Sequence, residues 1–156
     1  MTEPAVPAGQ TVHATAIVVG SSGLLFVGAS GAGKSRTAFA CLAAARVRGW
    51  NAALVADDQT ELELRGGRCL ASCPEPIQGL LELRGTGIVA LPRVERAVID
   101  LVVALAEPSV ATRLPPESET FSCNGIMLPL MRLWRVDAAD PLSLILASHP
   151  GPFSAR

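Results

Sequence analysis

Alternating and clustered hydrophobic positions divide the first third of the chain into three predicted elements. Two aliphatic, β-branched runs, Thr11–Val19 and Leu24–Val27, flank the turn sequence "SSG". Such runs around a tight turn predict two strands in an antiparallel pair. From Lys34 to about Arg48 the apolar residues recur at helical spacing, and Gly49 follows. This pattern predicts a helix with basic residues near its carboxyl end.

The middle of the chain reads as short strands separated by turns. "AALVADD" (52–58) predicts a buried strand that ends in two carboxylates. Residues 59–64 and 69–73, with "GGR" between them, predict a hairpin around a glycine turn. The segment 74–96 is rich in glycine and proline, and we expect it to be mostly loop.

The last third alternates between apolar runs and loop signals. "AVIDLVVALAE" (97–107) favours a strand because of its valine and isoleucine content. Residues 113–125 are expected to form a loop, 126–136 an extended run, and 141–148 a short helix. We therefore predict one domain at 11–148, preceded by an irregular lead-in (1–10) and followed by a tail (149–156).

The composition excludes several classes of protein. Of 156 residues, 49% are hydrophobic and 17% charged, which is typical of a packed globular domain. The net charge of −1 argues against broad binding to nucleic acid or to an anionic membrane. No apolar run reaches the roughly 20 residues of a membrane span. The four cysteines have no zinc-ligand spacing, so we expect reduced thiols in a cytoplasmic protein.

One stretch carries a strong chemical signal. "GASGAGKS" fits the phosphate-loop pattern G-x4-G-K-[ST] and contains the only lysine of the chain. Its glycines allow backbone N–H groups to approach phosphate oxygens, and the following helix adds its positive end. The predicted nucleotide-binding residues are Gly28, Ala29, Ser30, Gly31, Ala32, Gly33, Lys34 and Ser35. Lys34 would reach the β- and γ-phosphates, and Ser35 would offer a hydroxyl to Mg²⁺.

The adjacent carboxylates Asp57 and Asp58 close the strand that follows the predicted helix. Phosphoryl transfer needs a carboxylate for the metal or its waters, and sometimes another that takes a proton from the acceptor. Two carboxylates this close to a phosphate would fit both tasks. A solvated turn, with an aspartate capping the backbone, is the alternative.

In chain order, "GASGAGKS", "LVADD" and "LLELRGTGI" (80–88) resemble the catalytic domain of the bacterial HPr kinase/phosphorylase family. His13 adds to the resemblance because it lies 15 residues before Gly28, the spacing of that family's catalytic histidine. A weaker likeness at 112–133 places a functional arginine of the family at Arg113. The resemblance covers residues 11–133 and is closest to the short, alphaproteobacterial form without an N-terminal domain.

The resemblance implies an α/β P-loop domain related to phosphoenolpyruvate carboxykinase, with a mixed sheet and the phosphate loop between a strand and a helix. It implies a kinase that uses ATP and Mg²⁺ to phosphorylate a serine of HPr, or of an HPr-like phosphocarrier of the phosphotransferase system. The family also catalyses phosphorolysis of that phosphoserine. Here the Pro-Gly-Arg-Asn type run tied to phosphorolysis is absent, so the resemblance favours the kinase direction. A cytoplasmic homo-oligomer, usually a hexamer, is implied as well.

The resemblance also assigns roles. Ser35 and Glu82 would hold Mg²⁺, and one of Asp57 and Asp58 would take the serine proton, with Asp58 preferred. His13 and Arg113 would position or neutralise the transferred phosphoryl group. Arg84, two residues after Glu82, could share a strand face with it.

Two other functions remain open from the sequence. A small-molecule kinase of the same fold would need a closed pocket for its acceptor. A non-catalytic nucleotide sensor would need the phosphate loop but no proton acceptor. The donor, ATP or pyrophosphate, is likewise open.

Overall fold

Two long strands organise the fold, β1 (Gln10–Val19) and β8 (Arg96–Ala106). The computed structural model describes residues 10–74, 78–109, 119–134 and 140–149. Its strands form one mixed eight-stranded sheet and one separate two-stranded sheet. Both β1 and β8 are long enough to pair with different partners at their two ends, so they join two layers of the eight-stranded sheet.

The central layer contains the strands around the phosphate loop. The second half of β1 pairs antiparallel with β2 (Ser22–Val27) and with β3 (Ala52–Ala56). On its other side β2 runs parallel to β8, which in turn runs parallel to β10 (Ile126–Trp134). The antiparallel pair predicted from the "SSG" turn is confirmed.

The outer layer is the hairpin of β4 (Gln59–Arg65) and β5 (Arg68–Ser72). β4 pairs with the first residues of β1, and β5 pairs with the first residues of β8. Gly66 and Gly67 both have positive φ, 58° and 77°, as a two-residue hairpin turn requires. The predicted glycine-turn hairpin is therefore confirmed.

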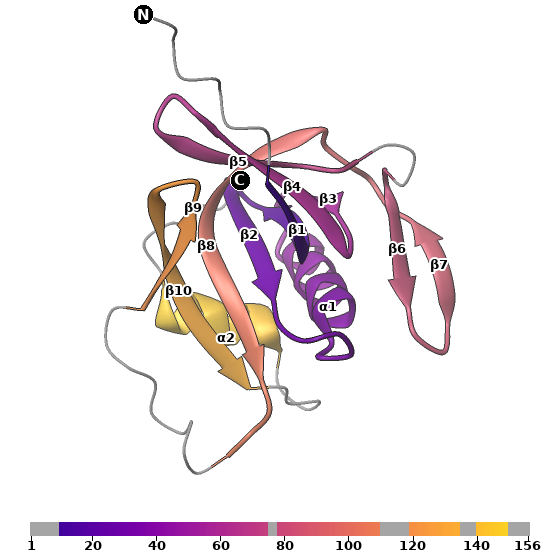
Figure 1. The fold of residues 1–156 in the computed structure, drawn as a ribbon. Helices are drawn as coiled ribbons and strands as arrows, with labels where there is room; N and C mark the ends of the chain where they lie inside the picture. Colours follow the sequence, from indigo (N-terminus) through magenta and orange to yellow (C-terminus); the bar gives the residue numbers. More distant parts are fainter. Residues whose placement is uncertain (1–9, 75–77, 110–118, 135–139, 150–156) are drawn as a thin grey trace, which may run out of the picture.

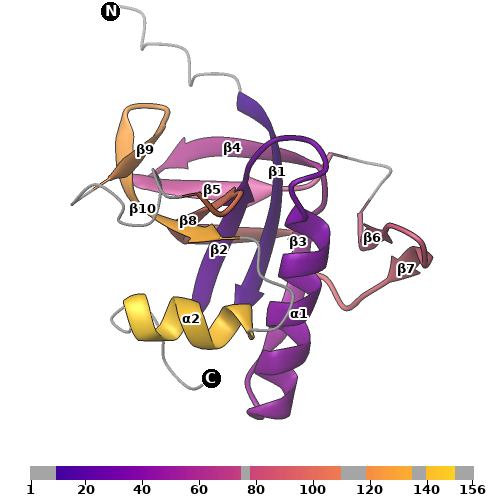
Figure 2. The ribbon, with the colours of Figure 1, turned by 90° about the horizontal axis from the view of Figure 1, so that it is seen from below.

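Helices α1 (Lys34–Val47) and α2 (Pro141–Ser148) cover the other face of the central layer (Figure 2). Side chains of β1 alternate accordingly, with Ile17 packing among the helices and Ala16 toward β4 and β5. Both helices were predicted from the sequence. No helix within the described part of the chain has the length and apolar character needed to cross a membrane.

The segment 74–96, expected to be mostly loop, has turns and irregular stretches among its described residues, but it also includes two strands that were not predicted. Residues 80–90 contain a second hairpin, β6 (Leu80–Leu83) and β7 (Gly87–Ala90), which stands beside the main sheet (Figure 1). Leu81 and Leu83 are buried against the helix side, while the alternate residues Glu82 and Arg84 are exposed. The two-residue alternation "LLELR" is the strand signal, and the neighbouring glycines obscured it.

Two further expectations need correction. Part of the predicted loop 113–125 is a strand, β9 (Thr120–Cys123), which pairs antiparallel with β10. The cysteines are not all reduced, because Cys69 of β5 and Cys123 of β9 form a disulfide. Cys41 and Cys73 are free and buried. The sequence separation of 54 between Cys69 and Cys123 hid the pairing, since only the folded sheet brings them together.

Candidate active site

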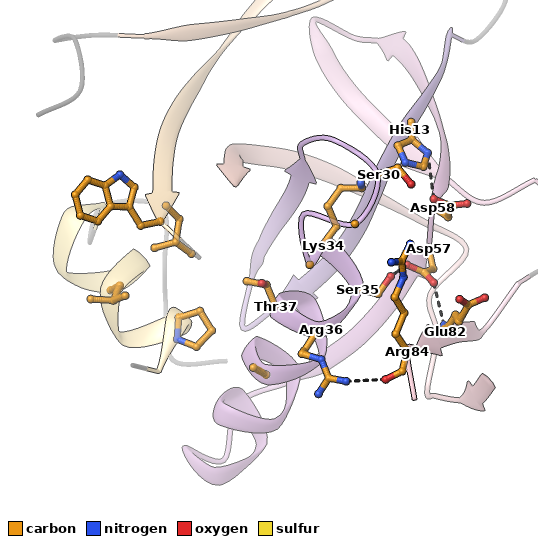
Figure 3. Close-up of a pocket in the computed structure, with 17 residues that line it drawn as sticks. His13, Ser30, Lys34, Ser35, Arg36, Thr37, Asp57, Asp58, Glu82 and Arg84 are labelled. Atoms are coloured by element: carbon orange, nitrogen blue, oxygen red, sulfur yellow. Dashed lines mark hydrogen bonds and ion pairs between the residues drawn. The ribbon is translucent and has the colours of Figure 1, made fainter. Parts of the chain in front are cut away.

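A cavity of about 580 Å³ opens where the phosphate loop meets the β3–β4 junction, β6, β10 and α2. Its volume lies within the usual range for sites that bind small molecules. Figure 3 shows the loop and the start of α1 between two groups of side chains from distant parts of the chain. One group is charged and mainly acidic, comes from β1, β6 with its turn and the β3–β4 junction, and is called the acidic end below: His13, Asp57, Asp58, Glu82 and Arg84. The other is apolar and comes from β10 and α2.

The phosphate loop has the backbone geometry that anion binding requires. Gly31 and Gly33 adopt positive φ values of 83° and 95°, which residues with a side chain rarely do. Gly33 is the N-cap of α1 and carries no side-chain cap, so the first N–H groups of the helix stay available to a ligand. The positive end of the helix therefore faces the cavity, as in other helix-terminal phosphate sites.

Lys34 lies at the centre of this loop and is only 6% exposed. Its Nζ donates to the carbonyl oxygens of Gly28 and Ala29, at 3.1 Å each. Burial lowers the pKa of the ammonium, and the nearby charges of Asp58 and Asp57 oppose this effect. Both of these contacts of Nζ within the described part of the chain are with neutral loop carbonyls, so an incoming phosphate would add a direct anionic partner.

Asp57, 8% exposed, is held on all sides by hydrogen-bond donors. Its Oδ1 accepts from the Ser35 hydroxyl at 2.5 Å and from the Thr15 hydroxyl at 2.9 Å. Its Oδ2 accepts from the backbone N–H of Glu82 at 3.0 Å. Three hydrogen bonds hold this carboxylate in one orientation. Asp57 thus ties together the loop, β1 and β6.

Asp58 has the opposite environment, with a side chain that is 65% exposed. Its backbone has a positive φ of 68°, so the chain turns sharply between the two carboxylates. This turn lets β3 and β4 pair with the same edge of β1, with Ala14 N–H donating to the Asp58 carbonyl. The Asp58 carboxylate lies 3.1 Å from Nδ1 of His13, which is itself 48% exposed. Asp58 therefore has a lone pair open to a reacting group.

Glu82 and Arg84 border the cavity from β6 and the turn after it. A Cβ placed on Gly31 would lie 3.6 Å from Nη1 of Arg84, so the guanidinium reaches the phosphate loop. Arg36 of α1 donates to the Arg84 carbonyl at 2.9 Å. Together with the bond from Glu82 N–H to Asp57, this contact attaches β6 to the loop (Figure 3).

The donors around the loop fit a magnesium nucleotide. Mg²⁺ is usually held by one or two protein oxygens together with substrate phosphates and waters, and a full protein cage is not required. Ser35 and Asp57 are already in contact, and the Glu82 carboxylate borders the same cavity. The predicted pair Ser35 and Glu82 thus has a third oxygen donor, Asp57, within reach.

The structure brings most of the predicted site residues into one cavity, while Arg113 lies outside the described residues. Sequence reasoning missed Thr15, which binds Asp57, and gave no role to Arg36. Thr15 did leave a signal, because it is a polar residue within an apolar strand pattern, two residues after His13 and so on the same strand face. Arg36 left none, since its partner is a backbone carbonyl 48 residues away.

Comparison with known proteins supports the likeness seen in the motifs. Residues 6–146 match the model of the HPr Serine kinase C-terminal domain. The HPr kinase/phosphorylase of Brevibacillus brevis is 33% identical over 132 residues, which cover 78% of this chain and 40% of that protein. The HPr kinase/phosphorylase of Xylella fastidiosa is 31% identical, with 94% of this chain and 55% of that protein covered. The chain thus spans about half the length of these relatives.

A solved structure gives the same result. The Hpr(Ser) kinase/phosphatase from Coxiella burnetii superposes with a TM-score of 0.73 and 26% sequence identity, covering 90% of both chains. The α/β P-loop kinase fold predicted from the motifs is confirmed. The extent of the family match, which takes in the phosphate loop, both aspartates and β6, leads to one conclusion. This chain is a member of the HPr serine kinase C-terminal domain family.

Proposed function

We propose that this chain is an ATP- and Mg²⁺-dependent protein-serine kinase whose acceptor is HPr or an HPr-like phosphocarrier. The observation that carries the proposal is the contrast between the two aspartates beside the phosphate loop. The Asp57 carboxylate accepts three hydrogen bonds, whereas that of Asp58 is exposed, is paired with His13 and borders the same cavity as Lys34. A site that only bound nucleotide would need no such open carboxylate.

The exposure of Asp58 also supports a protein acceptor. A base for a small acceptor usually lies inside a pocket that excludes water. Here the carboxylate is 65% exposed, at the rim of the cavity, where the serine of a folded protein could reach it. This position favours a protein-serine kinase over a small-molecule kinase of the same fold.

In the proposed reaction the serine hydroxyl gives its proton to the Asp58 carboxylate as its oxygen attacks the γ-phosphorus of ATP. The bond between the γ-phosphorus and the β-γ bridging oxygen breaks, and ADP leaves. Lys34 and the N–H groups of the loop stabilise the charge on the phosphates. His13 would hold Asp58 in place, and Arg84 would face the transferred group. Ser35, Asp57 and Glu82 would hold Mg²⁺, which neutralises phosphate charge when bound.

Reverse phosphorolysis would use the same groups. Inorganic phosphate would attack the phosphorus of phosphoserine, pyrophosphate would form, and the serine oxygen would regain a proton from Asp58. By family resemblance we also propose a cytoplasmic homo-oligomer, hexameric in form, whose mass sedimentation would measure.

The decisive experiment is transfer of labelled γ-phosphate from ATP to purified HPr, with HPr lacking its acceptor serine as the control. We expect labelling of the serine alone, and loss of labelling in Lys34→Ala. If neither HPr nor an HPr-like carrier becomes labelled at saturating ATP, the proposal is contradicted. ATP binding without any transfer would instead support the nucleotide-sensor alternative.

A further inference from the structure

The apolar end of the cavity has no part in the chemistry proposed above. We define it by its six lining residues, which come from α1, β10 and α2: Thr37, Ala40, Leu133, Trp134, Pro141 and Leu144. In the proposed function, the phosphate loop and the acidic residues bind the phosphates, hold the metal and accept the proton. The cavity nevertheless continues past them along the flank of α1.

The apolar character of α2 exceeds what the core requires. Leu142 and Ile145 are fully buried and attach the helix to the core. Pro141 and Leu144, three residues apart and so on one face of the helix, border the cavity instead. Leu144 is 36% exposed and does not belong to the core cluster. The helix therefore presents a second apolar face, and the cavity lies against it.

The direction of α1 relates this end to the phosphate loop. Thr37 and Ala40 follow Lys34 at intervals of three residues, so all three lie on the same side of the helix. The rise from Lys34 to Ala40 is about 9 Å at roughly 1.5 Å per residue. Such a span suits a ribose and base extending from phosphates held at the loop. Ala40 leaves room there because its side chain is small.

The proposed reaction fixes which way a nucleotide would lie. Its γ-phosphate must face Asp58 at the acidic end, so its nucleoside must point toward the opposite end. We propose that the apolar end binds the nucleobase of the phosphoryl donor, with the Trp134 ring and the Leu144 side chain packing against the base. This inference rests on the proposed function, since it takes the loop to hold the donor's phosphates.

The chemistry of the apolar end also predicts which phosphoryl donors it selects. Stacking on an aromatic ring tolerates any base, and among the six lining residues the polar groups are the Thr37 hydroxyl and the Trp134 indole N–H. The donor is therefore a nucleoside triphosphate, bound much more tightly than inorganic polyphosphate. ATP and GTP should bind within a few-fold of each other.

The test compares the binding of MgATP with that of magnesium tripolyphosphate, which has the phosphates but no base. In Trp134→Ala the dissociation constant of ATP should rise about tenfold or more, as loss of one stacked base predicts. Tripolyphosphate should bind within twofold of the wild-type value, which also shows that the variant is folded. Leu144→Ala should weaken ATP binding in the same selective way.

Two variants outside the cavity serve as matched controls. Val47→Ala removes an exposed aliphatic side chain at the far end of α1 and should leave both ligands unaffected. Trp50→Phe removes the other tryptophan, which lies beneath Arg48, and leaves Trp134 as the single fluorescent reporter. In that background ATP should change the Trp134 emission, and tripolyphosphate should not.

Three results would overturn the inference. The first is that ATP binds the wild-type protein no more tightly than tripolyphosphate does. The second is that Trp134→Ala weakens the binding of both ligands equally, and the third is that it weakens neither. If Lys34→Ala weakens both ligands and one of these results is found, the base site alone fails. If Lys34→Ala affects neither ligand, the phosphate site itself fails, and the proposed function with it.

Discussion

The two ends of the cavity hold their residues in different ways. At the acidic end, directional hydrogen bonds fix the polar groups, as in the three donors on Asp57 and the pairing of Asp58 with His13. At the apolar end, van der Waals packing fixes the elements, since Leu133 of β10 and Leu142 of α2 are part of the core and Leu144 follows on the same helix. Hydrogen bonds set position and direction, while apolar contacts set shape alone.

This difference matches two separate demands of phosphoryl transfer. The reacting groups must be aligned closely, because small misplacements are costly in rate. The part of the donor far from the reaction needs only to be held. We therefore expect changes at the acidic end to affect rate and metal dependence, and changes at the apolar end to affect donor affinity.

The largest effect on rate is expected for Asp58→Asn. Loss of the proton acceptor should lower the rate of transfer to HPr by roughly 10²- to 10⁴-fold. ATP affinity should stay within about twofold, because Asp58 is open and the loop does not depend on it. Single-turnover transfer and calorimetric titration would measure the two quantities. Glu63→Gln, which neutralises a carboxylate on the neighbouring β4, is the matched control. An equal loss of rate in this variant would show that the effect of Asp58→Asn is not specific to Asp58.

Asp57→Asn should produce a smaller loss with a different signature. The amide can still accept from Glu82 N–H, but its NH₂ group must then face the hydroxyls of Ser35 and Thr15. We expect a stability loss of about 1–3 kcal/mol in urea unfolding. We also expect about 10- to 100-fold more Mg²⁺ to be needed for half-maximal transfer.

The companion variant Glu82→Gln separates the two metal candidates. Because the Asp57–Glu82 bond uses the backbone of Glu82, this change leaves that bond in place. If Glu82→Gln raises the Mg²⁺ requirement and Asp57→Asn does not, the metal ligand is Glu82 and not Asp57. No change in either variant would exclude both carboxylates from the metal site.

A weaker effect is expected where the β6 turn attaches to α1. Arg36→Gln removes the hydrogen bond to the Arg84 carbonyl, worth about 1 kcal/mol, and should slow transfer about fivefold. Arg46→Gln, in the last turn of the same helix, is the control and should have no effect. Arg84→Gln keeps the backbone contact while removing the guanidinium. If Arg36→Gln affects ATP affinity as strongly as rate, Arg36 acts on the phosphates directly.

The two ends also differed in how well the sequence predicted them. The loop, the aspartates and Glu82 lie in short motifs whose spacing along the chain carries the information. Their elements were predicted as well, because alternating and helical periodicities mark β1, β2, β3 and α1. What the motifs could not tell was the difference in environment between the buried Asp57 and the exposed Asp58, which accompanies the positive φ of Asp58.

The apolar end left no comparable signal. Thr37 and Trp134 are nearly a hundred positions apart, and they border one cavity because β10 runs parallel to β8 and α2 packs against α1. A leucine such as Leu144 looks like any other core residue in a sequence. The β6–β7 hairpin was missed for a related reason, since its glycines indicate a loop when read locally.

The disulfide is expected to have the smallest effect on transfer and the largest on stability. Cys69 belongs to the hairpin behind the acidic end, and Cys123 belongs to β9, whose partner β10 leads to the apolar end. Closing a loop between residues 54 positions apart should stabilise the fold by about 4 kcal/mol. The bond lies among buried side chains on the face away from the helices, where it touches neither end of the cavity.

The double variant Cys69→Ala/Cys123→Ala should therefore unfold at a clearly lower urea concentration than the oxidised protein. At temperatures where both are folded, it should transfer phosphate within about twofold of the wild-type rate. Thiol titration of the denatured, unreduced protein should find two reactive groups, from Cys41 and Cys73. Four reactive thiols would show that the bond does not form. The disulfide links the β4–β5 pair to the β9–β10 pair. A large loss of transfer in the folded variant would therefore mean that the geometry of both ends of the cavity depends on this link.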